Sequence, residues 1–379
     1  MIGEQFSEEL ELVFNHLHEN PEVSWKEVET TAYLENFLKG KGLVPKRFEN
    51  MTGLYVDIGK GLPKVGFRTD MDALWQEVDG VFQANHSCGH DAHMTVALGV
   101  AVLLKEIESV LPGAVRIIFQ PAEEKAQGAK ALVGKGIIDP LQFLFGIHVR
   151  PLVELDDGTY SPGLHHGAAK LISGKITGME AHGARPELGI NAIEVAAGLV
   201  DGLKRIWLSP TESASIKMTH LQAGGSSTNI VPGTATFSID ARAQSNQTMD
   251  VLTDELDKII RALKVMYDVD IEYHVETHIA AAEVDETASG ILKQAIIETV
   301  GEDKCAEEIV TPGGEDFHFF TFSNPNLKTT MLGIGCGVSP GLHHPKMTLN
   351  TERLPTGADI ITKALILALD YVKGSERYD

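Results

Sequence analysis

Apolar residues along the chain switch between helical spacing and short continuous runs. The first predicted helix rests on apolar positions that recur every three or four residues: Phe6, Leu10, Val13, Phe14 and Leu17. Ser24 and Glu27 form a capping-box pattern, which predicts a second helix that ends near Gly40. Two helices are therefore expected before the first strand.

Strand-like and helix-like segments then alternate. Strands are predicted over 54–59, 64–69, 115–120 and 144–149, and a long helix over 94–110. This alternation predicts an α/β domain with a mixed sheet and helices on both of its faces. The unusual polar residues follow the predicted strands, and ligands of open α/β sheets bind at the carboxyl ends of strands.

A second domain is predicted as an insertion into the first. Between 170 and 277 the predicted order is β-α-β-β-α-β, with helices over 190–207 and 249–266, which is the ferredoxin-like order. About 110 residues are enough for such a unit to fold on its own. Helices over 289–300 and 358–372 would return to the first domain, which is therefore expected to comprise 1–169 and 278–379.

Composition excludes several functions. A chain of 379 residues supports two hydrophobic cores. The net charge of −21 argues against nucleic acid and against anionic membrane as partners, since both require clustered Lys and Arg. We expect a cytoplasmic protein, because no signal-like segment and no apolar run of roughly 20 residues are found. Three cysteines without close pairing indicate reduced thiols.

The first chemical cluster surrounds Cys88 and His90. His86, Asp91 and His93 lie within a few residues of them, ahead of the predicted long helix. A thiolate and an imidazole two residues apart are possible metal ligands, although such a pair alone is a weak signal. The alternative is a buried cysteine beside surface histidines.

A second cluster contains Glu123 and Glu124, directly after the predicted strand 115–120. Neighbouring side chains diverge, so one carboxylate can bind a metal ion while the other faces a water molecule and acts as a general base. Adjacent glutamates are more often simply solvated. The position at a strand end favours the functional interpretation.

Further polar residues are expected at the same edge of the sheet. His148 ends a predicted strand, and His343 lies in a Gly-rich segment; each alone is more often a hydrogen-bonded core residue than a ligand. Asp70 and Asp72 follow the predicted strand 64–69 and are candidates to orient ligand imidazoles by hydrogen bonds; a role in a turn or a helix cap is the alternative.

At this point the sequence resembles a known group, the aminoacylase and carboxypeptidase clan of two-metal hydrolases. The resemblance is to its amidohydrolase branch, which holds hippurate, indoleacetyl-amino-acid and N-acetyl-diaminopimelate hydrolases. Five motifs occur in the order found in that branch: His-Ser-Cys-Gly-His-Asp-Ala-His, Phe-Gln-Pro-Ala-Glu-Glu, Ala-His-Gly-Ala-Arg-Pro with Gly-Ile-Asn-Ala-Ile, Gly-Gly-Glu-Asp-Phe and Leu-His-His-Pro.

The resemblance implies roles for individual residues. It implies that the following residues bind two divalent metal ions: Cys88, His90, Glu124, His148 and His343. It implies that Glu123 is the catalytic base, that His182 contacts the substrate carbonyl, and that Asn229 and Arg242 meet the substrate carboxylate. A solvated histidine and an arginine paired with an acidic neighbour are the alternatives for His182 and Arg242.

The expected activity is hydrolysis of the amide bond of a small N-acyl amino acid. A metal-bridging water would attack the amide carbonyl, with Glu123 as general base. The first domain would then be catalytic and metal-binding, and the inserted one a lid or dimerisation domain of a homodimer. The donor set leaves zinc, manganese, cobalt and nickel open. A dipeptidase or exopeptidase is the nearest alternative, followed by a metal-binding or ligand-binding protein without turnover and by a structural zinc site.

Two positions depart from the family pattern, and one ligand assignment is open between two histidines. Trp75 stands where the family usually has proline, and Lys125 stands where a glycine run usually begins. The substrate of a relative therefore cannot be assigned directly to this protein. His343 and His344 compete for one ligand position.

Overall fold

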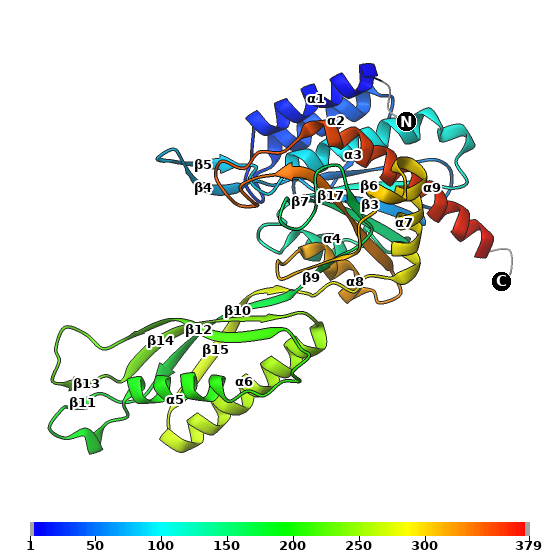
Figure 1. Cartoon of the computed structure of the whole chain (residues 1–379). Coiled ribbons are helices and arrows are strands. Elements are labelled where there is room, and N and C mark those ends of the chain that lie inside the picture. The colour runs from blue at the N-terminus through cyan, green and yellow to red at the C-terminus, as the bar shows by residue number, and fades with distance from the viewer. Residues whose placement is uncertain (1–3, 376–379) are drawn as a thin grey trace. The chain divides into compact units, whose positions relative to one another are not determined.

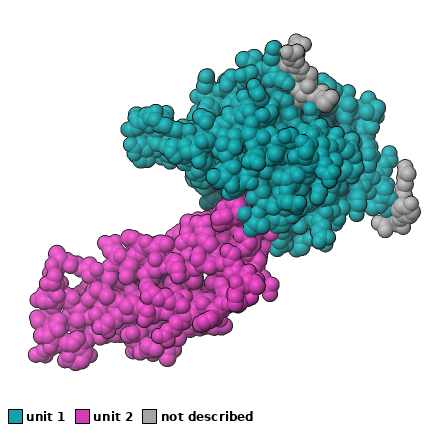
Figure 2. Space-filling view, in the orientation of Figure 1, with its two compact units in different colours: residues 1–165, 283–310, 316–379 teal, residues 166–282, 311–315 magenta. Residues whose placement is uncertain are grey.

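A computed structural model describes residues 4–375, which form two compact units. Unit 1 contains the described residues within 1–165, 283–310 and 316–379, and unit 2 contains residues 166–282 and 311–315 (Figure 2). The chain passes between units within two short strands, β9 (Leu164–His166) and β16 (Ile309–Thr311), after β15 (Asp270–Ile279), and after Glu315. Each unit has its own cluster of buried apolar residues.

Unit 1 is built on a seven-stranded mixed sheet (Figure 1). Its strands, in spatial order, are β1 (Lys46–Arg47), β2 (Leu54–Ile58), β6 (Val115–Gln120), β3 (Val65–Asp70), β7 (Phe143–Pro151), β17 (Lys328–Val338) and β8 (Tyr160–Ser161). The central strands β6, β3, β7 and β17 are parallel, and the outer pairings are antiparallel. β3 and β6 are buried along their whole length, as expected for strands covered on both faces.

Helices cover both faces of this sheet, as predicted. Figure 1 shows α1 (Glu4–Glu19), α2 (Val28–Gly40) and α3 (His90–Glu106) on one side. On the same side α3 contacts α9 (Leu354–Ser375), which contacts α7 (Glu286–Val300). The shorter helices α4 (Gly128–Gly134) and α8 (Phe319–Ser323) contact each other on the other side.

Unit 2 has the predicted β-α-β-β-α-β order. The elements are β10 (Ala168–Thr177), α5 (Ala192–Lys204), β12 (Ala214–Ala223), β14 (Thr234–Ala243), α6 (Asn246–Tyr267) and β15 (Asp270–Ile279). The strands form an antiparallel sheet in the order β12-β14-β10-β15, which is the ferredoxin-like arrangement. A separate pair joins β11 (Ala181–His182) to β13 (Ile230–Val231). The predicted fold class is therefore confirmed.

Two local predictions differ from the structure, and one element of the structure was not predicted. The capping box is wrong: α2 begins at Val28 without a side-chain cap, and the Ser24 hydroxyl instead donates to the Asp72 carboxylate at 2.6 Å. The long helix starts four residues earlier than predicted and ends at Glu106; a short 3-10 helix over Glu108–Val110 follows, two residues before Pro112.

The third difference is a β-hairpin that was not predicted, formed by β4 (Leu74–Val78) and β5 (Val81–Asn85). Its two-residue turn, Asp79-Gly80, has positive φ at both positions. An Asp-Gly turn between short strands is a recognised hairpin signal.

Among the described residues, no helix combines the length and apolarity needed to cross a membrane.

Candidate metal centre

The polar clusters of the sequence converge in unit 1, at the carboxyl ends of parallel strands. Asp70 ends β3, Glu123 and Glu124 follow β6, His148 lies in β7, and His343 follows β17. Parallel strands end at the same edge of a sheet, which places these segments together.

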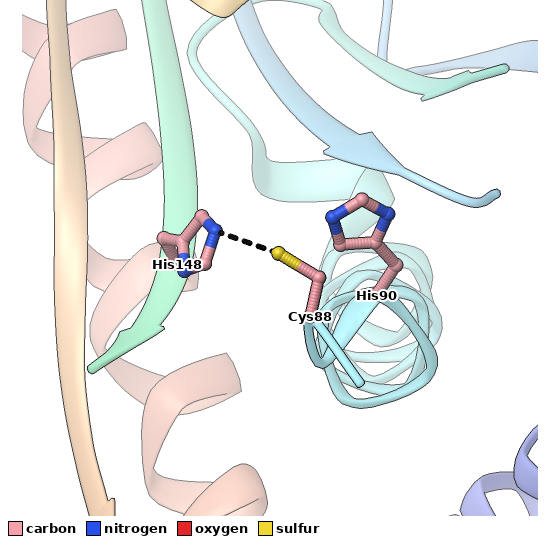
Figure 3. A group of neighbouring side chains, drawn as sticks. All are labelled: Cys88, His90 and His148. Carbon is pink, nitrogen blue, oxygen red and sulfur yellow. Dashed lines mark hydrogen bonds between the residues drawn. The ribbon is translucent and has the colours of Figure 1, made fainter. Parts of the chain in front are cut away.

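Cys88, His90 and His148 form the centre of the group (Figure 3). The Cys88 Sγ lies 3.7 Å from the Nε2 of His148. His90 donates from Nδ1 to the carbonyl oxygen of Asp72 at 2.8 Å, and His148 donates from Nδ1 to the carbonyl oxygen of Val149 at 2.7 Å. Because Nδ1 is the donor in both rings, the neutral form of each ring has its lone pair on Nε2, where it can bind a metal ion.

Two carboxylates complete the group. The Glu124 Oε1 lies 3.9 Å from the His90 Nε2 and 3.7 Å from the His343 Nε2. The Glu123 Oε2 lies 4.0 Å from the same nitrogen of His90. The Asp72 carboxylate accepts the backbone N–H groups of Glu123 and Glu124, at 3.0 and 3.1 Å, and thereby fixes the loop that carries both.

The donor atoms fit a metal ion. His90 Nε2 and Glu124 Oε1 are buried and have no hydrogen-bond partner among the described residues. Buried polar atoms are normally paired, so two unpaired atoms that face each other require an explanation. Thiolate, imidazole and carboxylate donors are ligands of zinc and of similar divalent transition metals.

Without a cation, burial disfavours the charged forms of Cys88, Glu124 and His148, whereas Asp70 and other neighbours raise the pKa of His90 despite its burial. Burial raises the pKa of the Cys88 thiol well above its usual value and raises the pKa of Glu124 to about 7. Burial and the neighbouring His93 lower the pKa of His148. A bound cation favours the deprotonated thiol and carboxylate, so binding should release protons.

Behind the ligands lies a buried charge network centred on Arg68, which is fully buried. Its guanidinium donates to Asp70 at 2.9 Å, to Asp316 at 2.8 Å and to the side-chain oxygen of Gln120 at 2.9 Å. The backbone N–H of Asp316 donates to the Glu123 carboxylate at 3.2 Å. The network therefore supports the residue expected to act as base.

His93 belongs to this network through both of its ring nitrogens. Its Nε2 accepts the backbone N–H of Val149 at 2.9 Å, so its Nδ1 carries the proton and donates to Asp70 at 2.7 Å. Both ring nitrogens are thus occupied, although His93 lies close to His90 and Asp70. Asp70, one of the two aspartates expected to orient ligand imidazoles, thus accepts its hydrogen bond from His93, and its Oδ1 lies 3.8 Å from the His90 Nδ1.

The choice between His343 and His344 follows from local contacts. His343 joins Cys88 and Glu124 in a group of possible ligand atoms. The Nδ1 of His344 instead accepts the backbone N–H of Lys346 at 3.1 Å. The geometry therefore favours His343 for the ligand position.

The remaining predicted residues, His182, Asn229 and Arg242, lie in unit 2. His182 is exposed on β11, and the carbonyl of Asn229 accepts the N–H of Gly183 at 2.7 Å, so these segments are neighbours. Arg242 lies at the opposite end of the sheet, where it pairs with Ala169, and it donates to Asp240 at 2.7 and 3.0 Å. The structure thus groups His182 with Asn229 and not with Arg242.

Sequence reasoning assigned no role to Arg68 or Asp316. Both carried a signal: Arg68 is a charged residue inside a predicted buried strand, and Asp316 belongs to the Gly-Gly-Glu-Asp-Phe motif. The sequence alone did not predict that the two residues form an ion pair, since 248 positions separate them.

Comparison with known proteins identifies the family. The model of peptidase family M20/M25/M40 matches residues 66–366, and the chain belongs to this family of hydrolases. The resemblance inferred from the motifs is thereby confirmed.

Two curated relatives and one solved structure illustrate the similarity. The chain is 30% identical to IAA-amino acid hydrolase ILR1-like 4 of Arabidopsis thaliana, over 91% of this chain and 82% of that protein. It is 27% identical to N-acetylcysteine deacetylase of Bacillus subtilis, over 94% and 96%. A dinuclear metal-binding M20 peptidase from Bacillus subtilis has a similar structure, with a TM-score of 0.83 and 25% identity, covering 97% of this chain and 99% of that one.

Proposed function

We propose that the protein is a metal-dependent amidohydrolase that cleaves the amide bond of N-acyl amino acids. The observation that carries the proposal is the pair Glu123 and Glu124 beside the Cys88 thiol and the His90 imidazole, whose buried Nε2 has no hydrogen-bond partner among the described residues. One carboxylate joins the ligand group, and the other stands next to it. A site that only binds metal has no use for the second carboxylate. The names of the two curated relatives, both acting on amino acids with an acyl group on nitrogen, support the substrate class.

The residues proposed to hold two divalent ions are Cys88, His90, Glu124, His148 and His343. The ions would polarise the amide carbonyl and make water more acidic. Zinc, manganese, cobalt and nickel all suit these donors.

Glu123 is proposed to move the proton. It accepts a proton from the attacking water, whose oxygen bonds to the amide carbon, and returns that proton to the nitrogen as the carbon–nitrogen bond breaks. The products are a carboxylic acid and an amine. The Asp316 N–H and the Asp72 carboxylate hold Glu123 in place for both transfers.

His182 is proposed to stabilise the oxyanion, from unit 2 of a partner subunit in a homodimer. Within unit 2, the ten residues of β10 separate the chain connection at Ala168 from the end that carries His182, a span of roughly 30 Å. Exposed apolar side chains surround that end, including Met179, Leu188 and Ile230. An exposed histidine within an apolar surface is suited to contact a second copy of the chain. Arg242 and Asn229 stay proposed contacts of the substrate carboxylate.

The experiment is to strip the protein with a chelator and restore it with each of the four metals. Amine release is then measured from N-acetyl, N-benzoyl and indoleacetyl amino acids and from dipeptides. The proposal expects activity only after metal is restored, and faster cleavage of N-acyl amino acids than of dipeptides. Undiminished activity of the stripped protein would refute metal dependence, and faster dipeptide cleavage would identify an exopeptidase.

A further inference from the structure

The hairpin of β4 and β5 lies next to the candidate metal centre in the sequence, between Asp72 and Cys88. Its strands pair in register, so that Gln76 stands directly opposite Gln83 and Leu74 opposite Asn85. Cross-strand partners point to the same face of a hairpin. Gln76, Gln83 and Asn85 therefore share one face.

Two side-chain amides on this face bind the loop that carries His343. Asn85 donates from Nδ2 to the Gln76 Oε1 at 2.7 Å and to the carbonyl oxygen of Pro345 at 3.0 Å. Gln76 donates from Nε2 to the carbonyl oxygen of His343 at 3.1 Å. The reverse orientation of the Gln76 amide would set donor against donor and acceptor against acceptor, so Asn85 fixes the direction in which Gln76 donates.

His343 depends on such support. Its side chain is 55% exposed, and its backbone φ is +63°, in the left-handed region that non-glycine residues seldom adopt. Its N–H donates to the carbonyl oxygen of Ser87 at 2.7 Å, next to Cys88. The two polar groups of the His343 backbone are thus held from two directions, by Ser87 and by Gln76.

We propose that Gln76 and Asn85 are positioning residues that hold the His343 imidazole toward Glu124, and that the hairpin thereby sets the affinity for one of the two metal ions. The inference rests on the proposed function, because it takes His343 as a ligand. Residues that orient metal ligands by hydrogen bonds typically change metal affinity by 10–100-fold when replaced.

The hairpin itself offers a matched control. Gln83 has the same side chain, stands opposite Gln76 on the same face, is exposed, and makes no side-chain hydrogen bond within the part of the chain that the structure describes. Gln76→Met and Gln83→Met remove the same amide at nearly constant size. Asn85→Ala provides a second perturbation of the network.

The test is metal binding by the chelator-stripped full chain. Calorimetric titration with Co²⁺ alone gives the affinity of each ion, thiolate-to-cobalt absorption reports the ion bound by Cys88, and thermal unfolding without metal reports stability. We expect Gln76→Met and Asn85→Ala to weaken one ion 10–100-fold, to leave the other ion within about threefold, and to leave metal-free unfolding unchanged. Gln83→Met should match wild type throughout.

Several outcomes would overturn the inference. Wild-type affinities in both Gln76→Met and Asn85→Ala, or equal weakening in Gln83→Met, would show that the amides do not position His343. Equal weakening of both ions with a lowered metal-free unfolding temperature would mean a general structural role. If wild type binds two ions and hydrolyses N-acyl amino acids, these results refute only the positioning role; a wild type that binds no metal refutes the proposed function as well.

Discussion

Replacing Arg68 with methionine tests the charge network behind the candidate metal centre. Arg68, Asp70 and Asp316 are all fully buried, and one guanidinium pairs with both carboxylates. Methionine keeps a similar length and apolar volume but leaves two buried carboxylates without their cation. Removing one partner of a buried ion pair costs about 3–5 kcal/mol.

The structure argues against simple doubling of this cost. Asp316 keeps hydrogen bonds from Gln120 at 2.7 Å and from the N–H of Ala129 at 2.9 Å, and Asp70 keeps its bond from His93. We therefore expect Arg68→Met to lower the free energy of unfolding of unit 1 by about 3–5 kcal/mol. Since domains are typically stable by about 5–15 kcal/mol, this is a large fraction of the total.

Urea unfolding in chelator at pH 7 measures the loss. Trp25 and Trp75 lie in unit 1 and Trp207 in unit 2, so a Trp207→Phe background makes tryptophan fluorescence report unit 1 alone. Arg353→Met is the control: its ion pair with Asp157 is exposed and should contribute less than about 1 kcal/mol. A loss below about 1 kcal/mol for Arg68→Met would refute the reasoning.

Three further predictions follow from single residues. Bound metal should protect Cys88 from alkylation at pH 9. In chelated protein Cys88 should be alkylated slowly, at a rate that increases with pH. An alkylation rate of Cys88 that does not depend on metal would contradict ligation. His182→Ala should lower turnover about 10²–10³-fold with metal content unchanged. Mixing this variant with Glu123→Gln should restore some activity. Mixed dimers that stay inactive after confirmed subunit exchange would rule out donation of His182 across the interface. A hydrogen bond to Asp91 raises the pKa of His18 in the folded protein. The charged His18 therefore stabilises the fold fully below about pH 6.5, and this stabilisation is lost as the pH rises through the higher folded pKa. His18→Gln should destabilise the chelated protein more at pH 6 than at pH 9 in urea unfolding, and equal losses of stability would contradict this.

The regular parts of the fold could be predicted from sequence because they rest on local patterns. The segment 115–120 is predicted as a strand with the bounds that β6 has, because Val115 and Ile117–Phe119 make a short, mostly apolar run that suits a buried strand. The order of elements in unit 2 was likewise read from the alternation of helical and strand spacing. In both cases the pattern that predicts an element lies within that element and a few residues on either side.

Two local features were not predicted, the first because it depends on a partner distant in sequence and the second because its apolar pattern is weak. Ser24 matched a helix cap, but its hydroxyl bonds to Asp72, 48 positions away. The strands of the β4–β5 hairpin are short and half-exposed, so their apolar pattern was weak, although the Asp79-Gly80 turn gave a local signal.

In the candidate site, too, local features could be predicted from the sequence and long-range contacts could not. The cluster at Cys88 and the glutamate pair could be identified because their residue types are chemically unusual at strand ends. The tautomers of His90 and His93 could not, because they depend on which carbonyl, carboxylate or N–H faces each ring. That difference separates a residue suited to bind metal from one that only supports the site.

The most direct test of the proposed activity compares Glu123→Gln with wild type in two measurements on the same sample, metal content and hydrolysis of the best N-acyl amino acid. Glutamine keeps the shape of the side chain but cannot accept the proton of water. The account predicts two bound ions and turnover lowered at least about 100-fold, the usual cost of removing a general base. A variant that keeps its metal and more than about a tenth of wild-type turnover would show that Glu123 is not the base.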